Sequence, residues 1–352
     1  MTCCTSYRRI VSGEAGGVGA GLARGALGLL SVPYRLGSSL VEIVRTGQGG
    51  TAVDVPVVSV GNLTAGGTGK TPFVALLVEQ LRAKGRRPVV LSRGWCAGAD
   101  GRNDEARVLE RRFPDLIHLQ GKDRVALAQH AATARLGDVL VLDDGFQYHA
   151  LARDLNVCLI DATNPWGYGA VLPRGLLRES PSALYRARPV VITRAELATP
   201  ERIAELRREI LAHNPYARIV VSEMQLTRLT DAAGAPQGDA ASLRGVTVVL
   251  ASGVGNPDAF ARSVRRVGAR VVAHVVRGDH HAWSQADAAE LARTAASHSA
   301  AQVVTTVKDA VKLAELAWPA AAPPLRAVEV EARITDGKAD WDKLLGEALS
   351  AR

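Results

Sequence analysis

At 352 residues, the chain is long enough for one large domain or two moderate ones. Hydrophobic residues make up 47% and charged residues 22%, a globular balance that excludes global disorder. Lys and Arg number 43 against 35 Asp and Glu, and the resulting charge of +8 favours nucleic acid, anionic lipid or phosphorylated substrates without choosing among them. The four cysteines form no C-x-x-C pair, so we expect reduced thiols rather than disulfides or a zinc site.

The first 50 or so residues differ in composition from the rest. Residues 18–46 are rich in Gly, Ala and Leu, and charged residues interrupt them before any run reaches the ~20 apolar residues that span a bilayer. A signal peptide fits poorly, because no small-residue cleavage site follows a compact apolar stretch. Residues 36–45 alternate at helical spacing and predict an amphipathic helix. The residues alone leave open whether it contacts a membrane, packs on the protein's own core or forms a loosely ordered leader.

A regular pattern begins at Pro56. Residues 56–60 predict a short apolar strand, a glycine-rich turn follows, and residues 71–84 place apolar side chains on one helical face. Gly85 ends that helix, and further strands are predicted at 88–91, 139–142, 157–160 and 190–193. Strands that alternate with helices predict a doubly wound, parallel α/β sheet.

A second strand and helix series is predicted after residues 231–239, whose Gly, Ala, Pro and Asp content suggests a connection between lobes. Its strands are expected at 246–251, 270–276 and 302–306. We therefore predict an N-terminal helical segment at 1–50, a core that contains the glycine-rich turn at 51–240 and a smaller C-terminal α/β lobe at 241–352.

The turn after the first strand nearly matches the Walker A pattern G-x-x-x-x-G-K-[ST], with Thr64 in place of the first Gly. Its glycines let backbone N–H groups surround phosphate oxygens, and the following helix offers its positive end. Lys70 is expected to reach the β- and γ-phosphates, and the Thr71 hydroxyl to ligate Mg²⁺. The predicted nucleotide-binding residues are Thr64, Ala65, Gly66, Gly67, Thr68, Gly69, Lys70 and Thr71.

A P-loop also needs a carboxylate on a neighbouring strand to hold Mg²⁺. Asp143 and Asp144 end the apolar run at 139–142 and fit that requirement, although two acids before Gly145 could also form a turn. We predict that Thr71, Asp143 and Asp144 hold the metal.

From Pro56 onward the chain resembles the tetraacyldisaccharide 4'-kinase (lipid A 4'-kinase) family. Several separate motifs in the expected order carry the resemblance over about the last 300 residues. They are Ser59-Val60-Gly61-Asn62-Leu63-Thr64, Leu91-Ser92-Arg93-Gly94-Trp95, Leu142-Asp143-Asp144-Gly145-Phe146-Gln147-Tyr148-His149, Ala152-Arg153-Asp154-Leu155, Leu172-Pro173-Arg174-Gly175 with Arg178-Glu179, and Lys308-Asp309-Ala310-Val311-Lys312.

The resemblance implies transfer of the γ-phosphate of ATP to the 4'-hydroxyl of an acylated glucosamine disaccharide 1-phosphate. It implies ATP and Mg²⁺ as cofactors and a peripheral position on the cytoplasmic face of the bacterial inner membrane. The lipid-linked substrate favours contact between the N-terminal segment and an anionic membrane surface. We expect neither a nucleic-acid partner nor an obligate protein partner.

The family's G-D-E-P and P-D-H strings carry a base and its supporting His. Here Asn103-Asp104-Glu105-Ala106 and Gly278-Asp279-His280-His281 stand in those places, so Asp104 and His280 inherit the catalytic roles beside Lys70. A carboxylate within hydrogen-bond reach can take the proton of a sugar hydroxyl as the O–P bond forms. The family's T-E-K-D string becomes Thr306-Val307-Lys308-Asp309 and loses one acid.

Arg174 and Arg178 stand in family-like strings and are candidates for binding the substrate's existing phosphate, because a guanidinium donates two bonds at once. A structural ion pair is the alternative for each.

Three other functions compete. A P-loop GTPase of the metallochaperone or assembly-switch type would need an Asn/Thr-Lys-x-Asp string, and Thr193-Arg194-Ala195-Glu196 changes both key residues. A nucleic-acid-binding ATPase would suit the basic charge, yet the chain offers no run of aromatic and basic residues for stacking. A divergent homologue that binds ATP without transferring phosphate is suggested by the altered G-D-E-P string.

Overall fold

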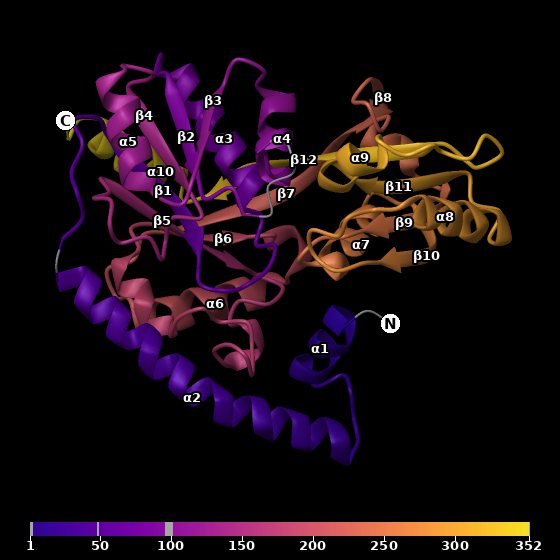
Figure 1. Ribbon diagram of the computed structural model, residues 1–352, viewed down its shortest axis with the longest axis horizontal. Helices are drawn as coiled ribbons and strands as arrows, with labels where there is room; N and C mark the ends of the chain where they lie inside the picture. The colour runs from indigo at the N-terminus through magenta and orange to yellow at the C-terminus, as the bar shows by residue number, and fades with distance from the viewer. Residues whose placement is uncertain (1–2, 48, 96–100, 352) are drawn as a thin grey trace. The chain divides into compact units, whose positions relative to one another are not determined.

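The computed structural model describes residues 3–47, 49–95 and 101–351, and within these it leaves undescribed the side chains of residues 3–6, 39 and 41–47. The chain divides into two compact units (Figure 1). Unit 1 contains residues 1–94, 115–223 and 333–352, and unit 2 contains residues 95–114 and 224–332. Each unit thus consists of stretches that are not consecutive in the chain. The division predicted from the sequence used consecutive segments, so it differs from this arrangement.

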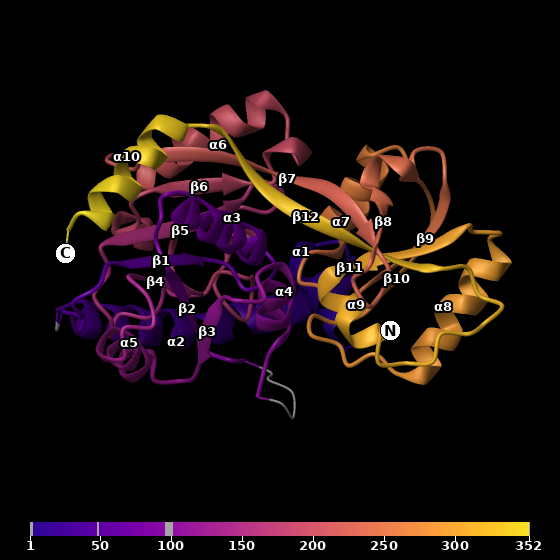
Figure 2. The same ribbon diagram turned by 90° about the horizontal axis from the view of Figure 1, so that it is seen from above.

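Unit 1 is built on a parallel sheet with the strand order β6-β5-β1-β4-β2-β3, which can be followed from above (Figure 2). Each neighbouring pair in this order is parallel. The strands are β1 (Val57–Asn62), β2 (Pro88–Ser92), β3 (Ile117–Gln120), β4 (Val139–Asp143), β5 (Leu155–Asp161) and β6 (Val190–Thr193). Strands β1, β2, β4 and β6 are buried at every position, as expected where helices cover both faces of a parallel sheet.

Four helices of unit 1 follow its strands in the alternating pattern that the sequence predicts. They are α3 (Lys70–Ala83), α5 (Arg124–Thr133), α6 (Pro200–His213) and α10 (Lys338–Leu349). Short 3-10 turns span Gly167–Gly169, Pro181–Arg186 and Ala195–Leu197. The ring of Trp341 on α10 is fully buried and packs edge-on against Phe73 of α3, with 5.3 Å between centroids.

Unit 2 has its own parallel strands in the order β10-β9-β11-β12. These are β9 (Thr247–Ser252), β10 (Arg270–Val276), β11 (Gln302–Thr306) and β12 (Leu325–Asp336). Its helices are α4 (Asp104–Arg112), α7 (Pro257–Arg266), α8 (Gln285–Ser297) and α9 (Val307–Leu313), and a 3-10 turn spans Ala240–Leu243. Strands β7 (Ile219–Thr230) and β12 contribute residues to both units.

Residues 231–239, expected to connect two lobes, lie entirely within unit 2. They form a turn and strand β8 (Pro236–Asp239), which pairs antiparallel with the end of β7. The Asp231 carboxylate accepts hydrogen bonds from the backbone N–H groups of Gly234 and Ala235, so the Gly- and Pro-rich composition here reflects a hairpin turn.

The N-terminal helices α1 (Cys3–Ser12) and α2 (Val18–Gly47) belong to unit 1 and are joined by Arg24, whose guanidinium donates to the carbonyls of Ile10 and Ala15. Figure 1 shows α2 as one long helix that continues through Pro33. The amphipathic helix predicted at 36–45 is thus the last part of a longer helix. In the described part of the chain, no helix is long and apolar enough to cross a membrane.

The strands predicted at 56–60, 88–91, 139–142, 157–160, 190–193, 246–251, 270–276 and 302–306 are confirmed within two residues at each end. The helix predicted at 71–84 is confirmed as α3, one residue earlier at both ends.

Candidate active site

The glycine-rich turn joins β1 to α3 in unit 1, the position that a phosphate-binding loop occupies. Gly66 and Gly69 adopt φ angles of +122° and +84°, which residues with a Cβ rarely reach. Gly69 is the N-cap of α3, so the helix begins at Lys70 with its first backbone N–H groups directed toward the loop. The backbone is therefore shaped to surround an anion at a helix N-terminus.

Thr64 replaces the first glycine of the Walker A pattern, and backbone pairing holds it in an extended conformation. It forms an isolated antiparallel bridge with Leu177, and the flanking hydrogen bonds are Ala65 N to Leu176 O at 2.6 Å and Arg178 N to Leu63 O at 2.7 Å. Since the Ala65 N–H is already bonded, the second half of the loop supplies the amides available to a phosphate. Strand-like pairing thus replaces the turn that a first glycine would make.

Lys70 lies beside two groups at the carboxyl ends of the neighbouring strands. Its Nζ donates to Asn62 Oδ1 at 2.9 Å and is 3.2 Å from Asp144 Oδ1. Arg178 donates to both oxygens of Asp144 at 3.0 Å and to Gln147 Oε1 at 3.3 Å. Burial acts to raise the pKa of Asp144, but the charges of Lys70 and Arg178 outweigh it and hold that pKa below the usual range.

The residues predicted to hold Mg²⁺ offer the hard oxygen donors that this ion requires. Asp143 is buried at the end of β4, in register with Val60 of β1, and Asp144 follows with its carboxylate ionised. Thr71 lies in the first turn of α3. Among the described residues no three His, Cys, Asp or Glu side chains gather as a metal cluster. Two carboxylates and one hydroxyl suffice, however, because Mg²⁺ in such sites also binds phosphate oxygens.

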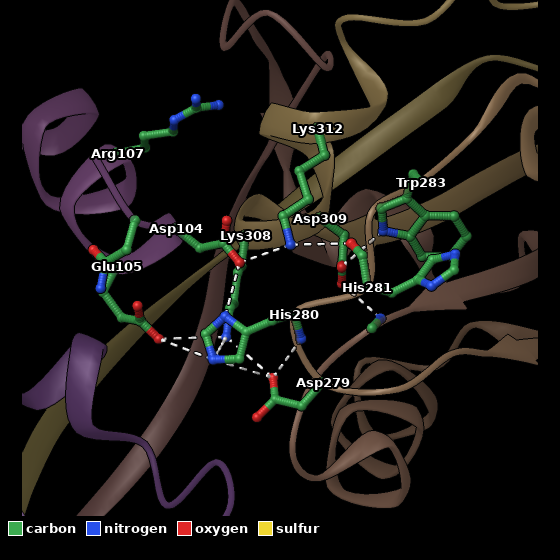
Figure 3. Close-up of polar contacts among 12 residues, drawn as sticks. Asp104, Glu105, Arg107, Asp279, His280, His281, Trp283, Lys308, Asp309 and Lys312 are labelled. Atoms are coloured by element: carbon green, nitrogen blue, oxygen red, sulfur yellow. Dashed lines mark hydrogen bonds and ion pairs between the residues drawn. The ribbon is translucent and has the colours of Figure 1, made fainter. Parts of the chain in front are cut away.

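In unit 2, Asp104 and His280 meet although 176 positions separate them in the chain (Figure 3). Asp104 is the first residue of α4, whose N-cap Asn103 accepts from Ala106 N, and His280 lies in the loop after β10. The distance from His280 Nδ1 to Asp104 Oδ2 is 3.1 Å. The sequence expectation that a carboxylate and a supporting His are neighbours is therefore realised in the geometry of this unit.

Two lysines of α9, four residues apart and thus on one helical face, complete this cluster. Lys312 Nζ is 2.7 Å from Asp104 Oδ2, and Lys308 Nζ is 3.1 Å from Asp279 Oδ1 and 3.4 Å from Glu105 Oε1. Burial acts to raise the pKa of Asp104, but the hydrogen bonds from His280 and Lys312 and the charges of both lysines lower it overall. Asp104 is therefore ionised near neutral pH, as a proton acceptor must be.

Asp309 accounts for the position of α9. It is fully buried and accepts from Gly253 N at 3.0 Å, Trp283 Nε1 at 3.0 Å and the N-cap hydroxyl of Thr306 at 2.8 Å. Trp283 belongs to the loop that carries His280, so one carboxylate ties this loop to the start of the helix. The family-like string at 308–312 thus contains a structural anchor as well as the two lysines.

Arg174 and Arg178, the candidates for the substrate's phosphate, both have partners within unit 1. The Arg174 guanidinium donates to the Val11 carbonyl of α1 at 3.1 Å, and Arg178 pairs with Asp144. Ser31 of α2 accepts from Arg174 N at 2.9 Å, and Tyr34 donates to the Arg178 carbonyl at 3.1 Å. The segment that contains these two arginines is therefore bonded both to the N-terminal helices and to the Asp144 carboxylate.

Reasoning from sequence did not identify Asn62, Gln147 or Lys312 as site residues. Each lies in a family-like string; Asn62 ends β1, and Gln147 lies in the turn that follows the paired acids after β4 and donates to the Asn62 carbonyl. Position at or shortly after the carboxyl end of a parallel strand is the signal that could have found those two. Lys312 had no local signal, because its partner Asp104 is far away in sequence.

A phosphate loop between strand and helix, a cationic Lys70 and an ionised carboxylate–histidine pair define a P-loop NTPase-like phosphotransferase. Sequence comparison gives the particular family: the model for tetraacyldisaccharide-1-P 4'-kinase matches residues 25–350. The chain belongs to this family, and it is an enzyme. The match favours the kinase over the GTPase alternative, and an ion pair between Arg194 and Asp161 occupies the segment after β6 where a guanine-binding string would lie.

Individual relatives agree with this assignment. The tetraacyldisaccharide 4'-kinase of Anaeromyxobacter sp. (strain K) is 39% identical over 94% of this chain and 92% of its own length. That of Geobacter sulfurreducens is 35% identical over 98% of this chain and 100% of its own. A crystal structure of LpxK from Aquifex aeolicus in complex with ATP superposes with a TM-score of 0.69 at 22% identity, covering 93% of this chain and 99% of that one, and confirms the fold.

Proposed function

We propose that this protein transfers the γ-phosphate of ATP to the 4'-hydroxyl of a tetraacyl glucosamine disaccharide 1-phosphate. The observation that carries the proposal is the contact between Asp104 and His280. This contact joins a proton acceptor to a supporting imidazole, and the same chain also contains a phosphate loop. Family membership supplies the substrate, and the relatives' names point to the same acceptor.

The residues of this chain have distinct tasks in the transfer. The loop amides and Lys70 hold the phosphates and stabilise the charge that spreads over the transferring group. Asp104 accepts the hydroxyl proton while the new O–P bond forms and the bond from the γ-phosphorus to the β–γ bridging oxygen breaks, leaving ADP. When Mg²⁺ is bound by Thr71, Asp143 and Asp144, it neutralises charge on the phosphate oxygens.

Arg178 serves the proposed site through Asp144. Because its guanidinium contacts both carboxylate oxygens, it fixes the side chain that also neighbours Lys70. A role in binding the substrate's existing phosphate remains our proposal for Arg174 and Arg178, with each arginine exchanging a contact for the phosphate when substrate binds.

We place the protein at the cytoplasmic face of the inner membrane, where the lipid substrate lies. The support is the apolar surface of α2, whose exposed large side chains include, among the described ones, Val18, Leu22, Leu29, Leu30, Val32, Leu36 and Leu40. Exposed apolar surface of this extent marks an interaction site. Peripheral binding to anionic lipid requires no other protein and suits the net charge of +8.

The test is phosphate transfer from γ-labelled ATP to tetraacyl disaccharide 1-phosphate in detergent micelles. Lys70→Ala should abolish transfer, because we propose that Lys70 contacts the transferring phosphate. Lys84→Ala, an exposed lysine directly after α3, is the matched control and should stay near wild type. Competition by unlabelled ATP but not GTP would separate the kinase from the GTPase alternative. Near-normal transfer by Lys70→Ala would refute the P-loop mechanism.

A further inference from the structure

The cluster around Asp104 contains more charge than a base and its supporting His require. Within unit 2, α4 contributes Asp104 and Glu105, the loop after β10 contributes Asp279 and His280, and α9 contributes Lys308 and Lys312 (Figure 3). Asp104 and Lys312 are largely buried, with 12% and 16% of their side chains exposed. Placing two ammonium groups in this setting costs desolvation, which their contacts with the surrounding carboxylates offset.

Both contacts to the Asp104 carboxylate converge on one oxygen. Oδ2 is 3.1 Å from His280 Nδ1 and 2.7 Å from Lys312 Nζ, and Oδ1 has no hydrogen bond or ion pair among the described residues. A carboxylate with one oxygen held by two donors cannot rotate freely, and its other oxygen keeps its lone pairs. Oδ1 is therefore the atom available to accept a proton.

Lys312 also reaches the loop that carries the imidazole. Its Nζ donates to the His281 carbonyl at 3.1 Å, so a single ammonium bonds the candidate base and the backbone next to His280. The same loop is anchored on its other side, where the His281 ring bonds Asp287 Oδ2 at 3.1 Å. The position of His280 relative to Asp104 is thus set through Lys312.

Lys308 contacts the ring nitrogen of His280 that faces away from Asp104. Its Nζ is 3.4 Å from His280 Nε2, and because an ammonium has no lone pair, this contact requires Nε2 to accept. The carboxylates of Glu105 and Asp279 lie farther from the same nitrogen, at 3.8 Å and 4.0 Å. The hydrogen then belongs on Nδ1, which donates it to Asp104 Oδ2. This tautomer is the one that supports an ionised Asp104.

We propose that Lys312 and Lys308 are positioning residues for phosphoryl transfer: Lys312 fixes the Asp104 carboxylate so that Oδ1 faces the acceptor hydroxyl, and Lys308 fixes the tautomer of His280. The inference rests on the proposed function, since it assigns roles around the same base. It adds two residues that act through Asp104 and His280 rather than through the nucleotide.

The test compares Lys312→Met, Lys312→Arg and Lys308→Met with Lys338→Met. Lys338 is the matched control, because it pairs with Asp342 at the same 2.7 Å on the surface of α10, where 66% of its side chain is exposed. Transfer to the lipid acceptor is measured from pH 4 to 9, together with KM for ATP. In the resting protein, ¹³C NMR follows titration of the Asp104 carboxyl and ¹⁵N NMR reports the His280 tautomer.

Lys312→Met should lower kcat at least tenfold with KM for ATP unchanged, and should move the acid limb of the pH profile to higher pH, because Asp104 loses a charge partner. Lys312→Arg should return the acid limb of the pH profile toward its wild-type position. Lys308→Met should give a mixture of His280 tautomers. Lys338→Met should match the wild type in every measurement. A drop of equal size at every pH, with unchanged Asp104 titration, would overturn the positioning role.

The two proposals fail in different ways. Absence of lipid phosphorylation by the wild-type enzyme would refute the proposed function, and the NMR measurements would then decide the arrangement around Asp104 without it. An active wild type together with an unshifted Asp104 titration in Lys312→Met would refute the positioning role alone.

Discussion

The apolar face of α2 gives a prediction whose size follows from the structure. At 100° per residue, the exposed residues Val18, Leu22, Leu29, Leu36 and Leu40 fall within an arc of about 40° on the helix. Such a stripe is suited to lie in a membrane interface. We expect the triple variant Leu22→Ser, Leu29→Ser and Leu36→Ser to bind lipid vesicles much less tightly than the wild type.

The three leucines have 71%, 77% and 68% of their surface exposed. Full burial of a Leu side chain contributes about 1.5–3 kcal/mol, so each leucine can gain about 1–2 kcal/mol on entering the interface. Together they account for about 3–6 kcal/mol, which corresponds to a loss of about 100-fold to 10,000-fold in vesicle affinity. The charge-dependent part of binding should remain, so residual binding should become more sensitive to salt.

Co-sedimentation with vesicles that contain anionic lipid measures this affinity. Tyr216→Ser is the control, because Tyr216 is 90% exposed in unit 1 but lies outside α2. Circular dichroism should confirm that the triple variant keeps its helix content. If it sediments as well as the wild type, α2 is a structural segment and the membrane hypothesis fails. Of the basic residues of α2, Arg24 donates to the carbonyls of Ile10 and Ala15, and the side chain of Arg45 lies outside the described part of the chain.

Three further outcomes are expected. Asp104→Ala should lower turnover about 100-fold or more at unchanged ATP affinity and His280→Ala somewhat less, and additive losses in the double variant would argue against a coupled pair. Trp341→Ala should reduce the free energy of unfolding by about 3–5 kcal/mol in denaturant titrations, and a loss below 1 kcal/mol would contradict its packing role. Burial lowers the pKa of His274 to about 4, below the unfolded value near 6.5. The stability that the neutral His274 side chain contributes is therefore fully present above pH 6.5 and is lost as the pH falls through 4. The stability of His274→Gln should therefore fall less on acidification, and parallel curves would refute this reasoning.

Local patterns in the sequence predict the centre of unit 1. A strand buried on both faces, such as β4, appears as a continuous run of Val and Leu, and the P-loop has its own spacing of Gly, Lys and Thr. Strand β3 is a short edge strand with an exposed Ile117, and β7 mixes buried and exposed positions over twelve residues, so neither produces such a run.

The candidate site could be predicted only in part, for a different physical reason. Asp104 and His280 were found through resemblance, because no local pattern shows that residues so distant in sequence are neighbours. Lys312 and Asp309 depend on contacts that exist only after α4, α9 and the loop after β10 have packed in unit 2. Such contacts are properties of tertiary structure, and periodicity carries no information about them.

The contacts of Trp341 bear on the order in which the protein is completed during synthesis. Its ring packs against Phe73, and its indole N–H donates to Gln80 Oε1 at 2.7 Å, so α10 covers residues of α3 that the ribosome made some 260 positions earlier. Until α10 emerges, this part of unit 1 exposes an apolar surface, although every strand of its parallel core has already been translated. The nascent chain is therefore expected to need protection from aggregation until late in translation.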